Sequence, residues 1–399
     1  MLGLNKQKLI SCLIISLWFS FSCASASELF VDDLPASGES LSVAEDTLIW
    51  INETEIVNIN GLNIIGDEQK IVTVRFHIDG EFLITGNIFC ENVDLEILTT
   101  KNGLFSANKV DVITDNNNNF SINNSGSMFL NNFSRETYRG FTYIFNYGEL
   151  LTENLFLKDQ NDGTIFLNNG NANLNSTTLV ANGAVSLFEI TNNGNLNFFD
   201  TSWDVNYGGL IVLNSVNGTL SLTNAAFDIS GSSHGKSSTI TIVDGNSSWR
   251  NCTIQNSNAQ FSYVNEKIVE IYNMKISTIN GGNTQIINNG NLKAEQFLVE
   301  TKGEQSNISI TNEDTFTFNP SIISGISLEK LSSIDESGEV FPQPNGGTIS
   351  FINKGSVNHK DTSISGNETN LESIFYFVII VVIILLLTLG YVYKKNKKL

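Results

Sequence analysis

The stretch Leu167-Asn-Asn-Gly170-Asn-Ala172 returns 24 residues later as Thr191-Asn-Asn-Gly194-Asn-Leu196. In each copy an Asn-rich turn with one glycine lies between residues of mostly apolar character. Three further copies are Phe145-Asn-Tyr-Gly148-Glu-Leu150, Ile287-Asn-Asn-Gly290-Asn-Leu292 and Ile352-Asn-Lys-Gly355-Ser-Val357. A motif that returns at a nearly fixed period is typical of repeat architectures, in which each repeat is one structural unit.

The glycine of this motif recurs along most of the chain. Its positions are Gly80, Gly103, Gly126, Gly148, Gly170, Gly194, Gly218, Gly245, Gly290 and Gly355. The first seven spacings are 22–27 residues, and the later spacings of 45 and 65 residues correspond to two and three further periods. Apolar and polar residues alternate after the turns, as around Leu220 and Leu222, which indicates short strands. Since a unit of this length cannot bury its apolar side alone, we expect the units to stack into a solenoid.

The pattern favours a parallel β-helix over a leucine-rich repeat. A leucine-rich repeat needs a Leu-x-x-Leu-x-Leu frame with a helical return segment, whereas β-branched and aromatic residues fill every part of this unit. We expect strands of successive coils to pair in parallel, with the Asn-Gly corners supplying left-handed backbone angles. Residues 36–319 contain no proline, as expected where nearly every strand donates N–H groups to a neighbour.

Asparagine is unusually frequent, with 54 residues in the chain. Asparagines at equivalent positions of successive coils can form hydrogen-bonded ladders inside or along a β-helix. A compositional bias from an AT-rich genome is an equally good explanation of the number.

The two ends of the chain indicate export and membrane anchoring. Lys6 and Lys8 precede an apolar run and the small residues 24–26, so we expect residues 1–26 to be a signal peptide that is removed. Residues 374–393 carry no charge and are long enough to span a bilayer as a helix. Lysines occupy positions 394, 395, 397 and 398, and the positive-inside rule places this tail, residues 394–399, in the cytoplasm. The predicted topology is type I.

The predicted domains between the ends follow from the repeat. Residues 27–45 are expected to form an N-terminal cap, residues 46–366 the β-helix, and residues 367–373 a short stalk. Within the β-helix, residues 328–345 are polar and hold two prolines, so we expect a loop or an irregular coil there.

Charge, apolar content and cysteine content limit the partners and the kind of stabilisation that we expect for this chain. Outside the leader and the tail the chain has 16 basic and 41 acidic residues, a net charge of −25, which disfavours nucleic acid and anionic membranes as partners. With 41% hydrophobic residues the chain has enough apolar material for a large core. Cys90 and Cys252 are the cysteines left after the leader, too few for a disulfide framework. If they lie on distant coils, we expect them to be buried and unpaired.

Sequons for N-glycosylation are spread along the chain. They begin at Asn52, Asn119, Asn123, Asn132, Asn175, Asn217, Asn246, Asn251, Asn307 and Asn367. Some will arise by chance in so Asn-rich a chain, but their spread indicates a solvent-facing, glycosylated surface in a eukaryotic secretory pathway.

We find no motif for catalysis, and we predict no catalytic residue, metal or cofactor. Polysaccharide lyases need a basic residue beside calcium-binding carboxylates, and the related hydrolases need clustered aspartates. The chain's arginines and histidines are instead distributed over distant repeats: Arg75, Arg135, Arg139, Arg250, His77, His234 and His359. The run Ser232-Ser-His234-Gly235-Lys236 is interpreted as a polar loop between coils.

Several aromatic residues have two interpretations. They are Trp50, Trp203, Trp249, Tyr207 and Tyr263. They are compatible with a glycan-binding face, but strand residues stacked in the core are the simpler interpretation.

The repeats resemble the pectin-lyase-like right-handed parallel β-helix superfamily, and more specifically the polymorphic outer membrane protein repeats of bacterial and protist surface proteins. Gly208-Gly-Leu-Ile211 and, more loosely, Gly346-Gly-Thr-Ile349 are similar to the Gly-Gly-apolar-apolar motif of those repeats. Phe129-Leu-Asn-Asn132, Phe166-Leu-Asn-Asn169 and Phe316-Thr-Phe-Asn319 are similar to their Phe-x-x-Asn motif. The resemblance implies a right-handed all-β coil and a role in adhesion or antigen display. A C-terminal helix in place of an autotransporter barrel suggests a protist-like surface protein.

Three functions follow as hypotheses. The first is a non-enzymatic plasma-membrane protein whose rigid, acidic and glycosylated β-helix serves adhesion or display, with an unidentified glycan or cell-surface protein as ligand. The second is a polysaccharide lyase or hydrolase, which rests on the scaffold alone. The third is a resident of the endoplasmic reticulum or Golgi membrane, because Lys395 and Lys397 have the spacing of a dilysine retrieval signal; a plain stop-transfer tail is the alternative.

Overall fold

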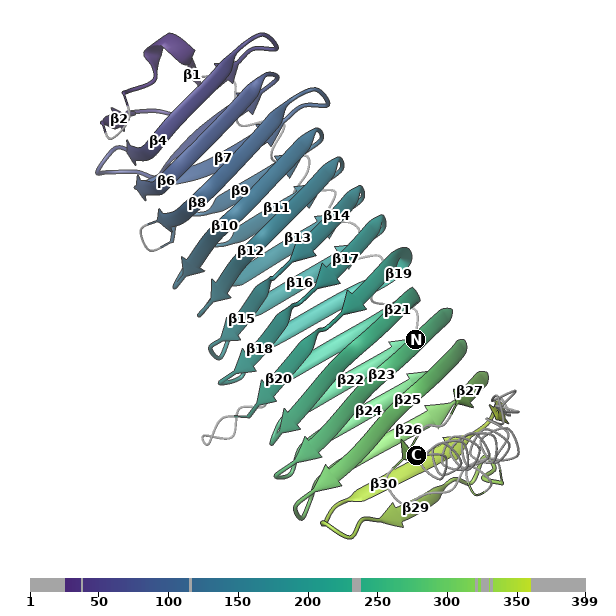
Figure 1. Ribbon diagram of the computed structural model, residues 1–399. Coiled ribbons are helices and arrows are strands. Elements are labelled where there is room, and N and C mark those ends of the chain that lie inside the picture. Colours follow the sequence, from purple (N-terminus) through teal and green to yellow (C-terminus); the bar gives the residue numbers. More distant parts are fainter. Residues whose placement is uncertain are drawn as a thin grey trace, which may run out of the picture. The chain divides into compact units, whose positions relative to one another are not determined.

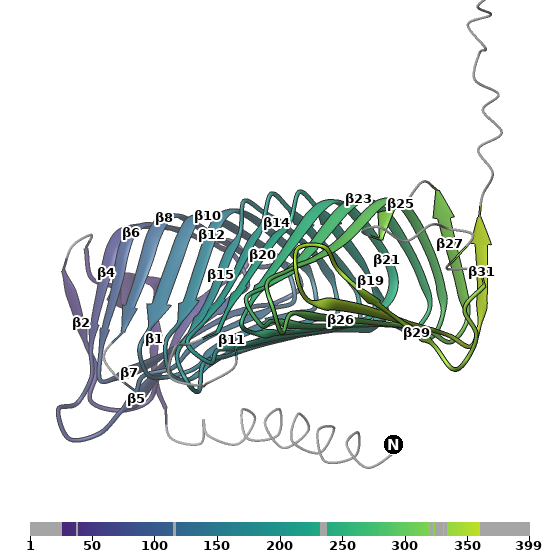
Figure 2. The same cartoon turned by 90° about the horizontal axis from the view of Figure 1, so that it is seen from below.

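The repeat unit forms one coil of a parallel β-helix. The computed structural model describes residues 26–36, 39–114, 117–231, 238–319, 322–323, 330 and 333–359. Within them the chain winds through about 12 coils of the right-handed type, so the all-β parallel solenoid predicted from the repeat is confirmed. The coils follow one another along one axis in sequence order (Figures 1 and 2).

Each coil contributes strands to three parallel sheets, and long strands bend from one sheet into the next. Sheet 1 contains β1 (Ser27–Phe30), β3 (Thr47–Ile51), β5 (Val72–Ile78), β7 (Val93–Thr99), β9 (Phe120–Asn124), β11 (Thr142–Asn146), β13 (Gly163–Asn168), β16 (Leu187–Asn192), the first parts of β19 (Leu210–Thr223) and β21 (Thr239–Ser257), β22 (Gln260–Asn265), β24 (Asn283–Asn288), β26 (Asn307–Asn312) and β30 (Thr348–Asn353).

Sheet 2 contains the first parts of β4 (Ile56–Ile65), β6 (Glu81–Glu91), β8 (Leu104–Thr114), β10 (Ser127–Thr137) and β12 (Glu149–Asp159), then β14 (Asn171–Asn175), β17 (Asn195–Phe199), later parts of β19 and β21, the first parts of β23 (Ile268–Ile279) and β25 (Asn291–Lys302), β27 (Thr315–Asn319) and β31 (Ser356–His359). Sheet 3 contains β2 (Ser40–Ser42), the second parts of β4, β6, β8, β10 and β12, then β15 (Thr178–Asn182), β18 (Ser202–Asn206), β20 (Ala226–Ser230), the ends of β21, β23 and β25, and β28 (Ile322–Ile323).

The core is filled by the inward side chains of the three sheets. Alternation places every second residue inside, so columns of side chains run along the axis at the spacing of neighbouring strands. One run of aromatic rings connects Phe198, Trp203, Phe227, Trp249 and Tyr263, with neighbouring centroids 4.9–5.9 Å apart. Trp203, Trp249 and Tyr263 are therefore core residues and do not form a glycan-binding face.

The other two aromatic residues with two interpretations lie elsewhere. Trp50 is half-buried and its ring centroid lies 4.2 Å from that of His77, and Tyr207 is 62% exposed. Both cysteines are buried, on β6 and β21, and are not joined by a disulfide, as the sequence predicts.

Asparagine ladders run through the inside of the β-helix at the end of sheet 1. The first links Thr99, Asn124, Asn146, Asn168, Asn192 and Ser215 by side-chain hydrogen bonds of 2.6–2.8 Å, and the second links Asn265, Asn288, Asn312 and Asn353 at 2.6–2.8 Å. A third set is exposed on sheet 2, where Asn195 donates to Asn171 and Asn197 donates to Asn173. The predicted ladders are confirmed both inside the coil and on its surface.

The predicted role of the Asn-Gly corners is wrong. None of the ten repeat glycines has a positive φ. Glycine is required there because consecutive coils approach closely: a Cβ atom on Gly170 would lie 2.2 Å from the carbonyl oxygen of Gly148. Close backbone approach and positive φ are separate reasons for glycine, and these corners use the first.

Left-handed angles occur at the other two corners, between sheets 3 and 1 and, most regularly, between sheets 2 and 3. One residue of each coil turns the chain at the corner between sheets 2 and 3, and asparagine is common at this position. These residues are Gly61, Gly86, Lys109, Asn132, Asn154, Ser176, Asp200, Asn224, Asn251, Asn273 and Gln296, with φ between 48° and 76°.

The C-terminal end of the β-helix contains one long insertion. β26 pairs directly with β30 in register Asn312 to Asn353, so the 65 residues from Gly290 to Gly355 hold two coils and not the three predicted. Within the segment 328–345, expected to be a loop or irregular coil, β29 (Glu339–Pro342) pairs antiparallel with β30 and covers its free edge. Edge strands that are covered in this way do not pair with other chains.

At the N-terminal end, the segment 27–45 contains β1, the 3-10 helix η1 (Val31–Asp33) and β2. β1 and β2 are the first strands of sheets 1 and 3. Among the described residues we find no helix with the length and apolar character to cross a membrane. Residues 1–25 of the predicted leader (residues 1–26) lie outside the described residues, as do the predicted stalk, membrane span and tail.

Candidate functional site

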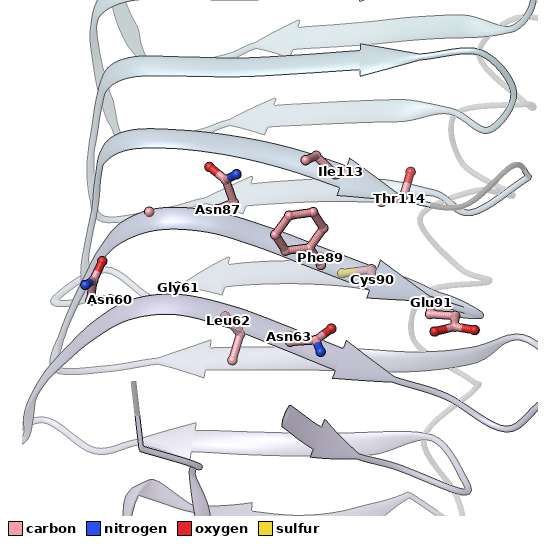
Figure 3. Close-up of a pocket in the computed structure, with 11 residues that line it drawn as sticks. Asn60, Gly61, Leu62, Asn63, Asn87, Phe89, Cys90, Glu91, Ile113 and Thr114 are labelled. Atoms are coloured by element: carbon pink, nitrogen blue, oxygen red, sulfur yellow. The ribbon is translucent and has the colours of Figure 1, made fainter. Parts of the chain in front are cut away.

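A surface groove of about 750 Å³ lies on the first coils, where sheet 2 turns into sheet 3 (Figure 3). It is built from the neighbouring strands β4, β6 and β8. Its lining residues are Asn60, Gly61, Leu62, Asn63, Gly86, Asn87, Phe89, Cys90, Glu91, Ile113 and Thr114.

The groove exists because these coils turn the corner differently from later ones. Gly61 and Gly86 hold the left-handed corner position here, so no side chain projects where later coils carry Lys109 or Asn132. The strand register also shifts at this corner, between Asn60 and Leu62 and between Thr85 and Ile88. A bulged corner without side chains leaves an open space on the surface.

The chemistry of the groove is suited to binding. Phe89 and Ile113 lie side by side in register on β6 and β8, and they are 44% and 43% exposed. Exposed apolar side chains of this size contribute most when a ligand covers them. Figure 3 shows the amides of Asn60, Asn63 and Asn87 and the carboxylate of Glu91 around them, which can donate and accept hydrogen bonds. The combination of an apolar platform with amides fits a polar, largely uncharged ligand.

The described residues of the enzyme hypothesis do not form one cluster: Arg75 and His77 are neighbours on β5, whereas Arg135 and Arg250 lie on β10 and β21 and Arg139 lies just after β10. Arg75 pairs with Glu96 across sheet 1 at 2.5 Å, and Arg139 lies over the exposed ring of Tyr138 at 6.0 Å. His77 approaches Asp79 at 3.7 Å, and its imidazole pKa is lowered mainly by burial. Within the described ranges no group of three or more His, Cys, Asp or Glu side chains could hold a metal ion. His234 and its loop lie outside the described residues, as does the side chain of His359.

Arg135 differs from Arg75, Arg139 and Arg250 because it is fully buried inside the coil. Its guanidinium donates to Thr142 Oγ1 at 2.8 Å, Thr114 Oγ1 at 3.3 Å and the carbonyl of Asn118 at 3.3 Å, and lies 5.2 Å from the Phe120 ring centroid. Burial lowers its pKa to about 10. It holds three turns of the chain together, a structural role that sequence spacing did not reveal.

Asp159 is a second buried charge, at the end of β12. Its Oδ1 accepts hydrogen bonds from the backbone N–H groups of Asn161 and Asp162, at 3.2 and 3.0 Å. Its Oδ2 is buried and has no hydrogen-bond partner among the described residues. Burial raises the pKa of this carboxyl to about 6.

We expect Asp159→Asn to raise the free energy of unfolding by about 2 kcal/mol at pH 7 and to have no such effect at pH 4. The folded state binds the Asp159 proton more tightly than the unfolded chain, because burial raises the pKa of this carboxyl. Its contribution to the free energy of unfolding is therefore fully present below about pH 4 and is lost as the pH rises through 6. Urea unfolding of both proteins at the two pH values measures the difference. An equal difference at both pH values would contradict the assignment.

The structure separates the sequons by exposure. Asn52, Asn132, Asn217, Asn246, Asn251 and Asn307 are exposed, and Asn119, Asn123 and Asn175 are half-buried. Asn367, like Lys395 and Lys397, lies outside the described residues. Most of the exposed sequons are at corners between sheets, where a glycan would extend away from the coil.

Comparison of the chain with protein-family models, with curated proteins and with solved structures finds no match. The candidate site therefore rests on the geometry of this chain alone.

Proposed function

We propose that this protein is a non-enzymatic β-helix of the cell surface that acts in adhesion or display. The observation that carries the proposal is the groove of Phe89 and Ile113 with its surrounding amides, a binding surface on a rigid scaffold. The buried asparagine ladders support the same function, because they fix successive coils relative to one another and keep such a surface preorganised.

The proposed location is the plasma membrane, with the β-helix outside the cell. The leader-like residues 1–26, the apolar residues 374–393 and the lysine tail support it, as do the exposed sequons. Labelling of intact cells with a membrane-impermeant reagent tests the location. Labelling only after permeabilisation would favour retention in the endoplasmic reticulum or Golgi through Lys395 and Lys397.

A relation to the pectin-lyase-like superfamily is part of the proposal, and the coil architecture is its support. The Phe-x-x-Asn matches do not add to it, because they occupy different places in the coil. Phe129 points outward from sheet 2, Phe166 is buried in sheet 1, and Phe316 is buried in sheet 2. A motif that defines a repeat should hold the same position in each copy.

We expect the double substitution Phe89→Ser with Ile113→Ser to weaken binding to target cells or glycans at least tenfold, because both apolar contacts of the groove are lost. The measurement uses the full chain in lipid nanodiscs on a glycan array and on host cells. Val185→Ser is the matched control. Val185 is 65% exposed and lies between β15 and β16, away from the groove. Equal loss from the control would mean that the groove is not the binding site.

A further inference from the structure

The outer face of sheet 1 carries a strip of aromatic side chains along a single strand. Phe141, Tyr143, Phe145 and Tyr147 alternate with buried residues along β11 and its flanks. The ring centroids of Phe141, Tyr143 and Phe145 are 5.8 and 6.1 Å apart in sequence order, and neighbouring ring planes differ by 22°. Phe141 is 36% and Tyr147 50% exposed. So much exposed aromatic surface on one strand indicates something that covers it.

Two sequon asparagines lie beside this strip, Asn123 on the preceding strand β9 (Phe120–Asn124) and Asn119 directly before it. Asn123 is in direct register with Phe145, and the Oδ1 of Asn119 accepts a hydrogen bond from the backbone N–H of Phe141. The Nδ2 of Asn119 is already engaged, because it donates to Asp94 at 3.0 Å. The Asn123 amide has no hydrogen bond to any described residue, so its nitrogen is available for a covalent bond.

The same arrangement occurs independently on sheet 2. Asn175 on β14 is in register with Phe199 on β17, which is 46% exposed. The amide of Asn175 likewise has no hydrogen bond within the described part of the chain, and its Oδ1 is buried. In both cases an aromatic ring follows the sequon asparagine by one coil, on the same face and in the neighbouring strand.

We propose that N-linked glycans on Asn123 and Asn175 fold back along the β-helix and cover the rings of Phe145 and Phe199. The inference rests on the proposed function, since the modification requires passage through the secretory pathway. The oligosaccharide comes from a lipid diphosphate donor: a bond forms between the sugar C1 and the amide nitrogen, the C1–O bond to the diphosphate breaks, and the amide loses one proton while the lipid diphosphate leaves.

The chemistry of the two partners is complementary. One face of a pyranose ring presents C–H groups, which pack on the negative face of an aromatic ring. The core of an N-glycan carries no charge, so it pays no Coulomb penalty near Asp94 and Asp162, whose negative charges act on Tyr143. Register with the asparagine fixes the ring about one strand spacing from the attachment point, within reach of the first sugar residues.

The experiment follows removal of each glycan from the native full-length chain. The chain is expressed in eukaryotic cells, solubilised in detergent and treated with an endoglycosidase that cuts between the two core sugars, and trimming at each site is followed by glycopeptide mass spectrometry. We expect Phe145→Ser to speed trimming at Asn123 about fivefold and to leave Asn175 unchanged. Phe199→Ser is expected to do the reverse, so each variant is the control for the other.

Two results would overturn the proposal. One is the absence of a glycan at both Asn123 and Asn175 in a chain that is glycosylated elsewhere. The other is a trimming rate that neither substitution changes at its own site. If one variant fails to fold, the other still tests the proposal, because Asn123 and Phe145 lie on sheet 1 whereas Asn175 and Phe199 lie on sheet 2. Neither result bears on adhesion or on surface location, which the binding and labelling experiments test separately.

Discussion

Replacing Asn168 by alanine is expected to lower the free energy of unfolding by about 4 kcal/mol. The side chain of Asn168 is fully buried, accepts from Asn146 Nδ2 at 2.7 Å, and donates to Asn192 Oδ1 at 2.8 Å and to the carbonyl of Asn195 at 2.9 Å. Alanine would leave partners on two neighbouring coils without their hydrogen bonds, and each buried polar group left unpaired costs about 1–3 kcal/mol. Urea unfolding followed by circular dichroism measures the change.

The neighbouring residue provides the control. Asn169 is exposed, and its Oδ1 accepts one hydrogen bond from Asn193 at 2.8 Å. Because water replaces a lost bond at the surface, Asn169→Ala is expected to change the free energy of unfolding by about 0.5 kcal/mol or less. Comparable losses from the two variants would show that the inner ladder contributes no more than the outer one.

The sequence was sufficient to predict the β-helix because each repeat contains the signals that determine its strands and turns. The spacing of 22–27 residues, the alternation and the absence of proline are local signals, and each is set by the pairing of a strand with its neighbours one coil away. The ladders followed from the same register, since identical side chains at equivalent positions must meet.

The direction of the aromatic strip could not be predicted by hydrophobicity. In the stretch from Phe141 to Tyr147, alternation alone would place the aromatic residues inside and the polar residues outside. The structure does the opposite, because Asn146 belongs to the inner ladder and Ile144 to the core. Successive side chains of a strand point to opposite faces of the sheet. Because Asn146 points inward, its neighbours Phe145 and Tyr147 point to the surface.

The groove and the insertion could not be predicted, because they depend on differences between coils and the repeat pattern shows only what the coils share. The groove arises where the register shifts around Gly86, a relation between strands that no single repeat shows. The insertion before β30 has no counterpart in the other coils that the structure describes, so counting residues from Gly290 to Gly355 gave one coil too many. The wrong assignment of left-handed angles has a similar cause, because sequence does not distinguish a glycine needed for positive φ from one needed for close approach.

That distinction leads to the second large effect, since two glycines of this chain should lose very different amounts of stability on substitution. We expect Gly170→Ala to lower the free energy of unfolding by about 3–4 kcal/mol, because its Cβ would meet the carbonyl oxygen of Gly148 at 2.2 Å and two coils would have to separate. Gly61 has φ +76° and its added Cβ would find no atom closer than 3.8 Å. Asparagine tolerates this backbone angle and fills the same corner at Asn132, so Gly61→Asn is expected to cost about 0.5 kcal/mol or less. Thermal and urea unfolding of the two variants test the contrast, and a larger loss at Gly61 than at Gly170 would mean that backbone angle, and not the approach of neighbouring coils, is what selects glycine along this β-helix.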